Sequence, residues 1–237
     1  MEVKNNKRIL ASAMSCALGL SVSPVSMAAN NILIESNPDP DNVNIDTNID
    51  ATVSAFSSND DSAILKFESI ESAWSSGHAV TVETSELGTN SEAGTITLDA
   101  ALDFNNYGSS SLSLTAHDAI YINADIADSD NSSADSLTLQ LSPGAGADVF
   151  LNATIGEYTN TTIDGGLVIG ATGIYKLVHA SDSLTADSIT NVAGGVFEYN
   201  AGSLTLNDTL SIASGELLGD ALVLGADQTL QTDDSDI

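Results

Sequence analysis

The sequence predicts an all-β fold, a right-handed parallel β-helix (a solenoid) with an N-terminal cap that contains a short helix. The first observation is an eight-residue phrase that appears three times, as Thr95–Leu102, Ala119–Ile126 and Asp148–Ile155. The copies begin 24 and 29 residues apart, within the range of solenoid repeats. The second observation is a short alternating run before each copy, such as Ser111–Ala116, which predicts two strands in each turn.

Aligning the three copies places their apolar residues in columns. The columns are Ile96/Ile120/Val149, Leu98/Ile122/Leu151 and Leu102/Ile126/Ile155. A column of Thr97, Tyr121 and Phe150 separates the first two, so the period is two, as a strand with one buried face requires. We therefore expect the apolar side chains to stack inside the solenoid.

A polar column formed by Asp99, Asn123 and Asn152 follows directly. When strands stack in parallel, side-chain amides at one position can hydrogen-bond along the stack. We expect these three residues to form a structural ladder.

The run Ser111–Ile126 reads Ser-Leu-Ser-Leu-Thr-Ala-His-Asp-Ala-Ile-Tyr-Ile-Asn-Ala-Asp-Ile. This form resembles the β-helical repeats of large secreted bacterial adhesins of the filamentous-haemagglutinin type, and the resemblance covers residues 64–155. The segment Gly195–Leu230 is similar to the Gly-Ser-Leu-Thr-Leu ladders of autotransporter passenger domains, another group of right-handed β-helices. Two-partner-secreted members carry an Asn-Pro-Asn signature, which is not carried over because the nearest match here is Asn37-Pro38-Asp39.

The N-terminal residues 1–28 have the pattern of a secretory signal peptide. Three basic residues precede an apolar run over 9–22, and Ser26-Met27-Ala28 supplies the small residues of a cleavage site. The apolar run is too short for a membrane span. Cleavage would remove Cys16, the one cysteine, so the mature chain would contain no disulfide and no transmembrane segment.

The chain is strongly acidic, with a formal charge of −28. Cleavage would remove three of the five basic residues and one of the 33 acids, which takes the charge to −30 and leaves Lys66 and Lys176 as the basic residues. This balance argues against nucleic acid or an anionic membrane as the partner.

Residues 29–62 are predicted to form an acidic N-terminal leader or cap. The spacing in Asp46-Thr47-Asn48-Ile49-Asp50 is that of the start of a calcium loop, but the sixth position lacks glycine and Ser57 occupies the twelfth. We interpret this stretch as a solvated entry strand.

The segment after the leader has the helical spacing of a cap. Phe67, Ile70 and Trp74 fall on one face, Ser69 is the predicted N-cap, and Gly77 would end the helix. We expect the helix to cover the open end of the first turn, with Trp74 in the core beneath it.

The parallel β-helix is predicted over residues 63–230, and residues 231–237 form an acidic tail. Beyond Ile155 the expected strands are Leu167–Ile169, Ile174–Val178, Val196–Tyr199, Leu204–Leu206, Leu210–Ile212, Leu222–Leu224 and Thr229–Leu230. The acidic end without a polar cap indicates a short or truncated member of a family of longer proteins.

The sequence contains no residue set that is typical of catalysis or of a cofactor site. His78, His117 and His179 have no recurring spacing, and no nucleotide-binding or nucleophile motif is present. A polysaccharide-cleaving β-helix enzyme is the catalytic alternative, but acids do not pair at matching positions of the turns. We expect no enzyme activity and no bound cofactor, with calcium as the one ion that the acidic composition favours.

These observations predict a secreted adhesin-type structural or binding module of a Gram-negative bacterium, displayed at the cell surface or associated with the outer membrane. It would be a complete short protein or a fragment of a longer one. Its expected partner is a component of a host-cell, matrix or bacterial surface, with an outer-membrane secretion pore as a second partner. The noncatalytic alternative is a calcium-dependent surface assembly protein.

Overall fold

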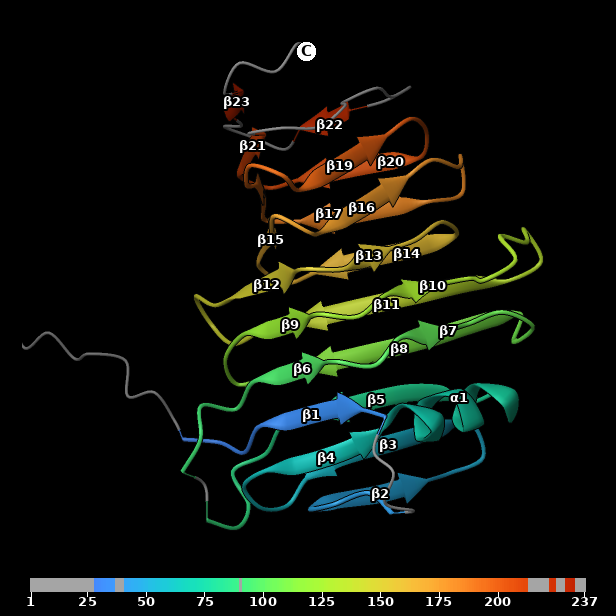
Figure 1. Ribbon diagram of the computed structural model, residues 1–237, viewed down its shortest axis with the longest axis vertical. Coiled ribbons are helices and arrows are strands. Elements are labelled where there is room, and N and C mark those ends of the chain that lie inside the picture. The colour runs from blue at the N-terminus through green and yellow to red at the C-terminus, as the bar shows by residue number, and fades with distance from the viewer. Residues whose placement is uncertain (1–27, 37–40, 90, 213–221, 225–228, 233–237) are drawn as a thin grey trace, which may run out of the picture.

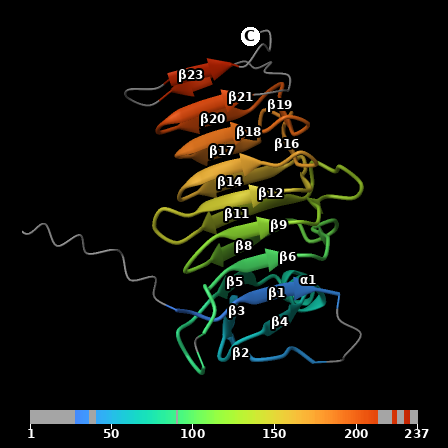
Figure 2. The ribbon, with the colours of Figure 1, turned by 60° about the vertical axis from the view of Figure 1, so that its left-hand side comes forward.

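The computed structural model describes residues 28–36, 41–89, 91–212, 222–224 and 229–232. Within this part the chain is mostly strand, and three mainly parallel sheets stack into one solenoid (Figures 1 and 2). The prediction of an all-β parallel solenoid is confirmed. The predicted signal peptide, apart from Ala28, and residues 233–237 of the predicted tail lie outside the described residues.

The strands of each sheet are as follows. The first sheet contains β1 (Ile32–Glu35), β4 (Ala63–Lys66), β6 (Ile96–Leu98), β9 (Ile120–Ile122), β12 (Asp148–Leu151), β15 (Gly166–Ile169), β18 (Ser188–Asn191), β21 (Thr209–Ile212) and β23 (Thr229–Thr232). The second contains β2 (Ile45–Ile49), β3 (Val53–Ser58), β5 (Ala79–Glu83), β8 (Ser109–Thr115), β11 (Ser136–Ser142), β14 (Thr159–Ile163), β17 (Ser183–Ala186), β20 (Ser203–Leu206) and β22 (Leu222–Leu224). The third contains β7 (Leu102–Asp103), β10 (Ile126–Ala127), β13 (Thr154–Ile155), β16 (Ile174–Leu177) and β19 (Val196–Tyr199).

Each full turn passes through the first, third and second sheets, so the prediction of two strands per turn is wrong. The eight-residue phrase is two strands joined by a bend: in the second copy, β9 ends at Ile122 and β10 begins at Ile126. Ile126 pairs with Leu102 below and Ile155 above, so the third apolar column belongs to the third sheet. The bend falls on the polar column, where the chain leaves one sheet for the next.

The apolar columns of the first sheet lie in register and point into the solenoid. The pairs along the stack are Ile96–Ile120–Val149 and Leu98–Ile122–Leu151. All six side chains are fully buried and belong to one continuous core. Burying one such side chain contributes about 1.5–3 kcal/mol, so repetition of the columns drives the stacking.

The predicted leader contributes strands to the stack. β1 lies between β4 and β6 and pairs in parallel with both. Its inward residues Ile32 and Ile34 are buried. Pairing on both edges satisfies the backbone of β1, which a solvated leader would leave to water.

The helix α1 spans Phe67–Ser75, and the prediction of Ser69 as its N-cap is wrong. Lys66 holds the N-cap position in an extended conformation, because β4 runs directly into the helix. Gly77 ends the helix as predicted, with a φ of +75° and its N–H donating to the carbonyl of Trp74 over 2.8 Å. Left-handed φ values favour glycine because it has no Cβ.

α1 stands between β4 and β5, where later turns place a strand of the third sheet. The backbone N–H of Asp103 in β7 donates to Glu71 Oε1 of the helix over 3.3 Å. Trp74 is 2 % exposed, and its Nε1–H donates to the carbonyl of Ser111 over 2.9 Å. The prediction that Trp74 lies in the core is therefore confirmed.

Two aromatic rings stack on the outer face of the first sheet. Tyr121 and Phe150 lie one turn apart with ring centroids 5.1 Å apart and planes 13° from parallel. Both side chains are half-buried, so Tyr121 is not the plain surface residue that alternation alone predicts.

We expect Ile122→Ala to lower the free energy of unfolding by about 2–5 kcal/mol, because it opens a cavity in a fully buried column. Tyr121→Ala should cost about 1 kcal/mol through loss of the stacked ring. Thr97→Ala, in the same outward column without a ring partner, is the control and should change stability by less than about 0.5 kcal/mol. Chemical denaturation measures all three, and equal losses at Ile122 and Thr97 would contradict the register.

Candidate functional site

The structure brings Asp99, Asn123 and Asn152 together as a ladder between the first and third sheets. Asn123 Nδ2 donates to Asp99 Oδ1 over 2.9 Å, and Asn152 Nδ2 donates to Asn123 Oδ1 over 2.9 Å. At the next turn stands Gly170, where a Cβ atom would lie 2.2 Å from Asn152 Oδ1. The ladder residues bond to one another, which gives them a structural role at an exposed bend.

The connections from the third sheet to the second differ in length from turn to turn. We call the surface that they form the loop edge, and it consists of residues 104–108, 128–135, 156–158, 178–182 and 200–202. The loop after β10 projects furthest from the stack in Figure 1. The strands on either side stay in register although the loops differ in length. The loop edge is therefore the surface that can change without disturbing the core.

Three carboxylates converge in the longest of these loops. Ligand atoms of Asp128, Asp130 and Asp135 all lie within 4.8 Å of one another. Asp128 and Asp135 are 3 % and 6 % exposed, respectively. The N–H of Ser132 donates to Asp128 Oδ2 and the N–H of Gly108 to Asp135 Oδ1, both over 2.7 Å. Burial raises the pKa of Asp128 despite these bonds.

These three aspartates are the described residues that could hold a divalent cation, because carboxylate oxygens are the ligands that calcium prefers. The sequence alone does not single out these three aspartates. Their Asp-x-Asp spacing was visible, but the folding back of Asp135 beside them depends on the conformation of the whole loop.

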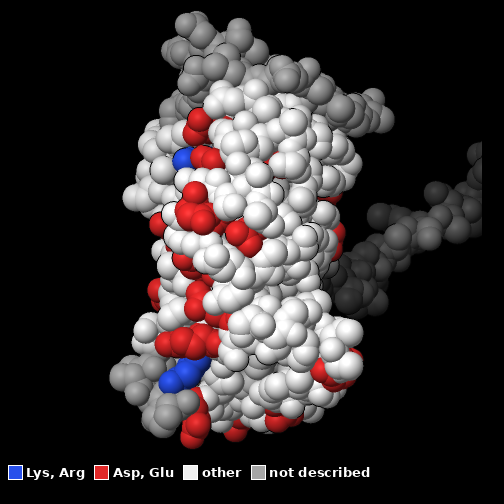
Figure 3. All heavy atoms as spheres, turned by 90° about the vertical axis from the view of Figure 1, so that its right-hand side faces the viewer, with Lys and Arg blue, Asp and Glu red and all other residues white. Residues whose placement is uncertain are grey.

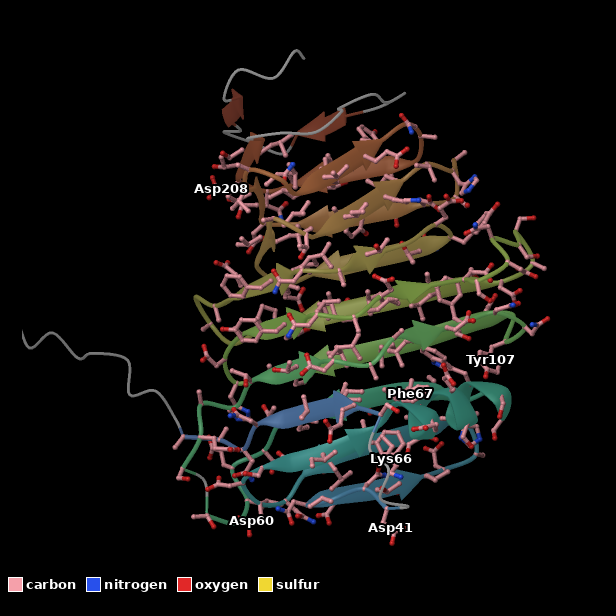
Figure 4. The ribbon with its side chains drawn as sticks, in the orientation of Figure 1. Asp41, Asp60, Lys66, Phe67, Tyr107 and Asp208 are labelled. Atoms are coloured by element: carbon pink, nitrogen blue, oxygen red, sulfur yellow. The ribbon has the colours of Figure 1, made fainter. Side chains whose placement is uncertain are left out.

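Acidic side chains also gather beside the helix. Burial raises the pKa of Glu71, and the neighbouring carboxylates of Asp103 and Glu68 raise it further. Burial raises the pKa of Tyr107, with Glu71 and Asp103 adding to the effect. Figure 3 shows Asp and Glu side chains in a column along this side of the molecule. In Figure 4, Tyr107 lies on the same side of the molecule. This side therefore repels anions and attracts cations.

The three histidines lie on separate turns, each with its own partner. The pairs are His78 Nδ1 with Ser54 Oγ at 3.0 Å, His117 Nδ1 with Thr84 Oγ1 at 2.8 Å, and His179 Nε2 with Glu157 Oε2 at 2.8 Å. The structure does not bring the histidines together as a metal triad. Glu157 Oε1 also lies 3.7 Å from Lys176 Nζ, so one of the two lysines in the described part of the chain is paired.

A pocket of about 640 Å³ opens at the N-terminal end of the stack. The inward faces of β2 and β3 line one side through Thr47, Ile49 and Phe56, and α1 lines the other through Ser69 and Ser72. It is the open interior of the first turn, below which no strand of the described chain lies. Lys66, which also lines it, lies at the start of the helix in Figure 4.

Comparison with known proteins finds no matching family model, no matching curated protein and no matching solved structure. Among the described residues, no helix has the length and apolar character needed to cross a membrane. The site is therefore interpreted from its own geometry.

We expect Asn123→Asp to lower the free energy of unfolding by on the order of 1 kcal/mol at neutral pH, because it removes the donor to Asp99 and sets two carboxylates side by side. The loss should be smaller in acid, because a protonated carboxyl is neutral and can donate to its neighbour. Asp99→Asn is the matched control: it keeps an acceptor for Asn123 and should not destabilise. Thermal unfolding across pH tests this, and a pH-independent loss at Asn123 would contradict a ladder role.

We expect Asp128→Asn to raise the midpoint of thermal unfolding at pH 7. The pKa of Asp128 is raised in the folded state, so the wild-type protein loses stability as pH rises from the unfolded-state value through the folded-state value. The advantage of the variant should therefore be present above that window and vanish below about pH 3.9. Asp130→Asn, at the exposed member of the cluster, is the control, and a gain that persists at low pH would argue against burial as its cause.

Proposed function

We propose that the protein is a secreted or surface-displayed adhesin-type module of a Gram-negative bacterium. In this proposal the solenoid is a right-handed β-helix, the N-terminal residues 1–28 direct export, and the N-terminal turn with α1 forms its cap. The chain presents a rigid stack that binds a surface and transforms no substrate.

The observation that supports this function is the loop edge. Its loops differ in length from turn to turn, while the buried columns below keep one register from Ile96 to Leu210. A rigid core under variable loops is suited to display, because the loops can diverge without a cost to packing.

The proposed partner is a component of a host-cell, matrix or bacterial surface, and the proposed export partner is an outer-membrane pore. The formal charge of −28 disfavours approach to an anionic surface at low ionic strength. At 0.1 M salt, charge repulsion is largely screened beyond about 10 Å. Binding of this acidic chain to such a surface should therefore strengthen as the salt concentration rises.

We expect the exported protein to adhere to cells or polysaccharide-coated plates, more strongly at high salt or with millimolar calcium. The double variant Ser133→Arg/Ala134→Arg changes two exposed positions of the loop edge and should alter adhesion at an unchanged unfolding midpoint. Thr97→Ala, on the first sheet, is the matched control and should adhere as the wild type does. If both variants bind like the wild type, adhesion does not use the loop edge.

The same purified samples distinguish the adhesin from the two alternative functions. Release of reducing sugar or unsaturated uronate, abolished by substitution of acids, would favour a polysaccharide-cleaving enzyme and overturn the adhesin proposal. Light scattering that rises with calcium, without adhesion to any surface, would favour a calcium-dependent assembly protein.

A further inference from the structure

The strand β2 leaves an open edge at the N-terminal end of the stack. It is the last strand of the second sheet, and among the described strands its one partner is β3, to which it is antiparallel. Figure 1 shows β2 at the foot of the solenoid. Natural edge strands are usually protected by charged side chains, proline or a bulge; Ile45–Ile49 contains no proline and no lysine, and its one charged residue is Asp46.

Hydrogen bonds at both ends of the β2–β3 ladder show which backbone groups face this edge. The N–H of Asp50 donates to the carbonyl of Val53 over 3.0 Å, and the N–H of Asn59 donates to the carbonyl of Asn44 over 2.9 Å. Hydrogen-bonded pairs recur at every second residue of an antiparallel ladder. The even-numbered residues from 44 to 50 therefore bond to β3.

The odd-numbered residues of β2 consequently direct their N–H and C=O groups to the open edge. These are Ile45, Thr47 and Ile49. They pair across the ladder with Ser58, Phe56 and Ser54, all buried, so they share the interior face of the sheet. Ile49 is nevertheless 61 % exposed, because no turn covers it from below.

We propose that this edge pairs with β2 of a second copy of the chain, antiparallel and about a two-fold axis at Thr47. Thr47 then faces Thr47 of the second copy, and Ile45 faces Ile49 of the second copy on both sides of the axis. All three pairs join residues whose backbone groups point outward, so the second sheets of the two copies become one continuous sheet. The interface is isologous, as a two-fold dimer requires.

The charges of β2 and its flanks select this register. Centred on Thr47, the pairing sets Asp46 opposite Asn48 of the second copy, so the carboxylate within β2 faces an amide. The adjacent registers with the same hydrogen-bond pattern set Asp46 opposite itself or opposite Asp50. Like charges directly opposite each other destabilise a strand pair.

The apolar residues add to this selection. Ile45 and Ile49 of the two copies would meet across the strand pair and cover the exposed surface of Ile49. The formal charge of −28 on each copy opposes the association, so the dimer should strengthen as salt screens the repulsion. The proposal concerns the N-terminal end of the stack and does not depend on adhesion at the loop edge.

Cysteine cross-linking tests the register directly. In the full chain carrying Cys16→Ser, Thr47→Cys should form a disulfide-linked dimer under mild oxidation, because an opposed hydrogen-bonded pair has Cα atoms about 5.5 Å apart. Asn48→Cys is the matched control: the two copies of residue 48 would be diagonal, about 7–8 Å apart, and should cross-link much less. Faster cross-linking at residue 48, or none at either position, would overturn the proposal.

Sedimentation velocity across concentration and salt tests the charges. Asn48→Asp should raise the dissociation constant about tenfold by setting carboxylates opposite each other twice. The exchange Asp46→Asn/Asn48→Asp should restore wild-type association, because the carboxylate within β2 again faces an amide. A monomer at every concentration, or a dimer that both variants leave unchanged, would show that β2 does not pair as proposed. Unfolding midpoints confirm that the variants are folded.

Discussion

Parallel pairing between successive turns is the interaction on which the whole structure depends. Each strand inside a sheet bonds to the strand on either side of it, and this spacing sets like positions of the chain over one another. Apolar residues then meet apolar residues in the interior, and Asn123 meets Asp99 and Asn152 at the bend. A change of register by one residue would turn every buried side chain of that strand outward.

The pairing between turns does not fix the length of the connections between the sheets. The connection between β10 and β11 is long and acidic, whereas that between β13 and β14 is short, yet both pairs of strands belong to the same two sheets. The buried carboxylates of Asp128 and Asp135 occur in the long connection. The N–H of Ser132, in the same connection, donates to Asp128, and the N–H of Gly108, in the connection one turn below, donates to Asp135. The loop edge thus contains buried carboxylates, and we place the proposed binding role there.

A stack built by pairing must also end. β1 enters between β4 and β6, so the first sheet ends at β4, where Val43 forms an isolated antiparallel bridge with Ile64. α1 takes the place of a strand of the third sheet. The second sheet ends differently, because β2 reverses direction against β3 and turns its own outer edge to solvent. The same backbone groups that hold the turns together are therefore available to another chain at β2.

The sequence by itself determined the repeating part of the fold. Alternation at Ile120 and Ile122 depends on neighbouring residues alone, and comparison of three copies was enough to align the columns and the ladder. The third sheet was missed because β7, β10 and β13 are two residues long, too short for alternation to be visible. β14, β17 and β18 were also missed. In β14 and β18, Thr159, Thr161 and Asn191 are polar at inward positions, where the pattern requires apolar residues.

The tertiary structure alone decided which distant segments meet. No local pattern indicates that Ile32–Glu35 lies between two later strands, because that pairing depends on edges that form about thirty and sixty residues further along the chain. Contacts between distant segments also decide that Asp135 lies beside Asp128 and that the odd-numbered backbone groups of β2 point outward. Local sequence sets which face of a strand is buried, whereas the pairing of distant backbone groups sets what lies next to it.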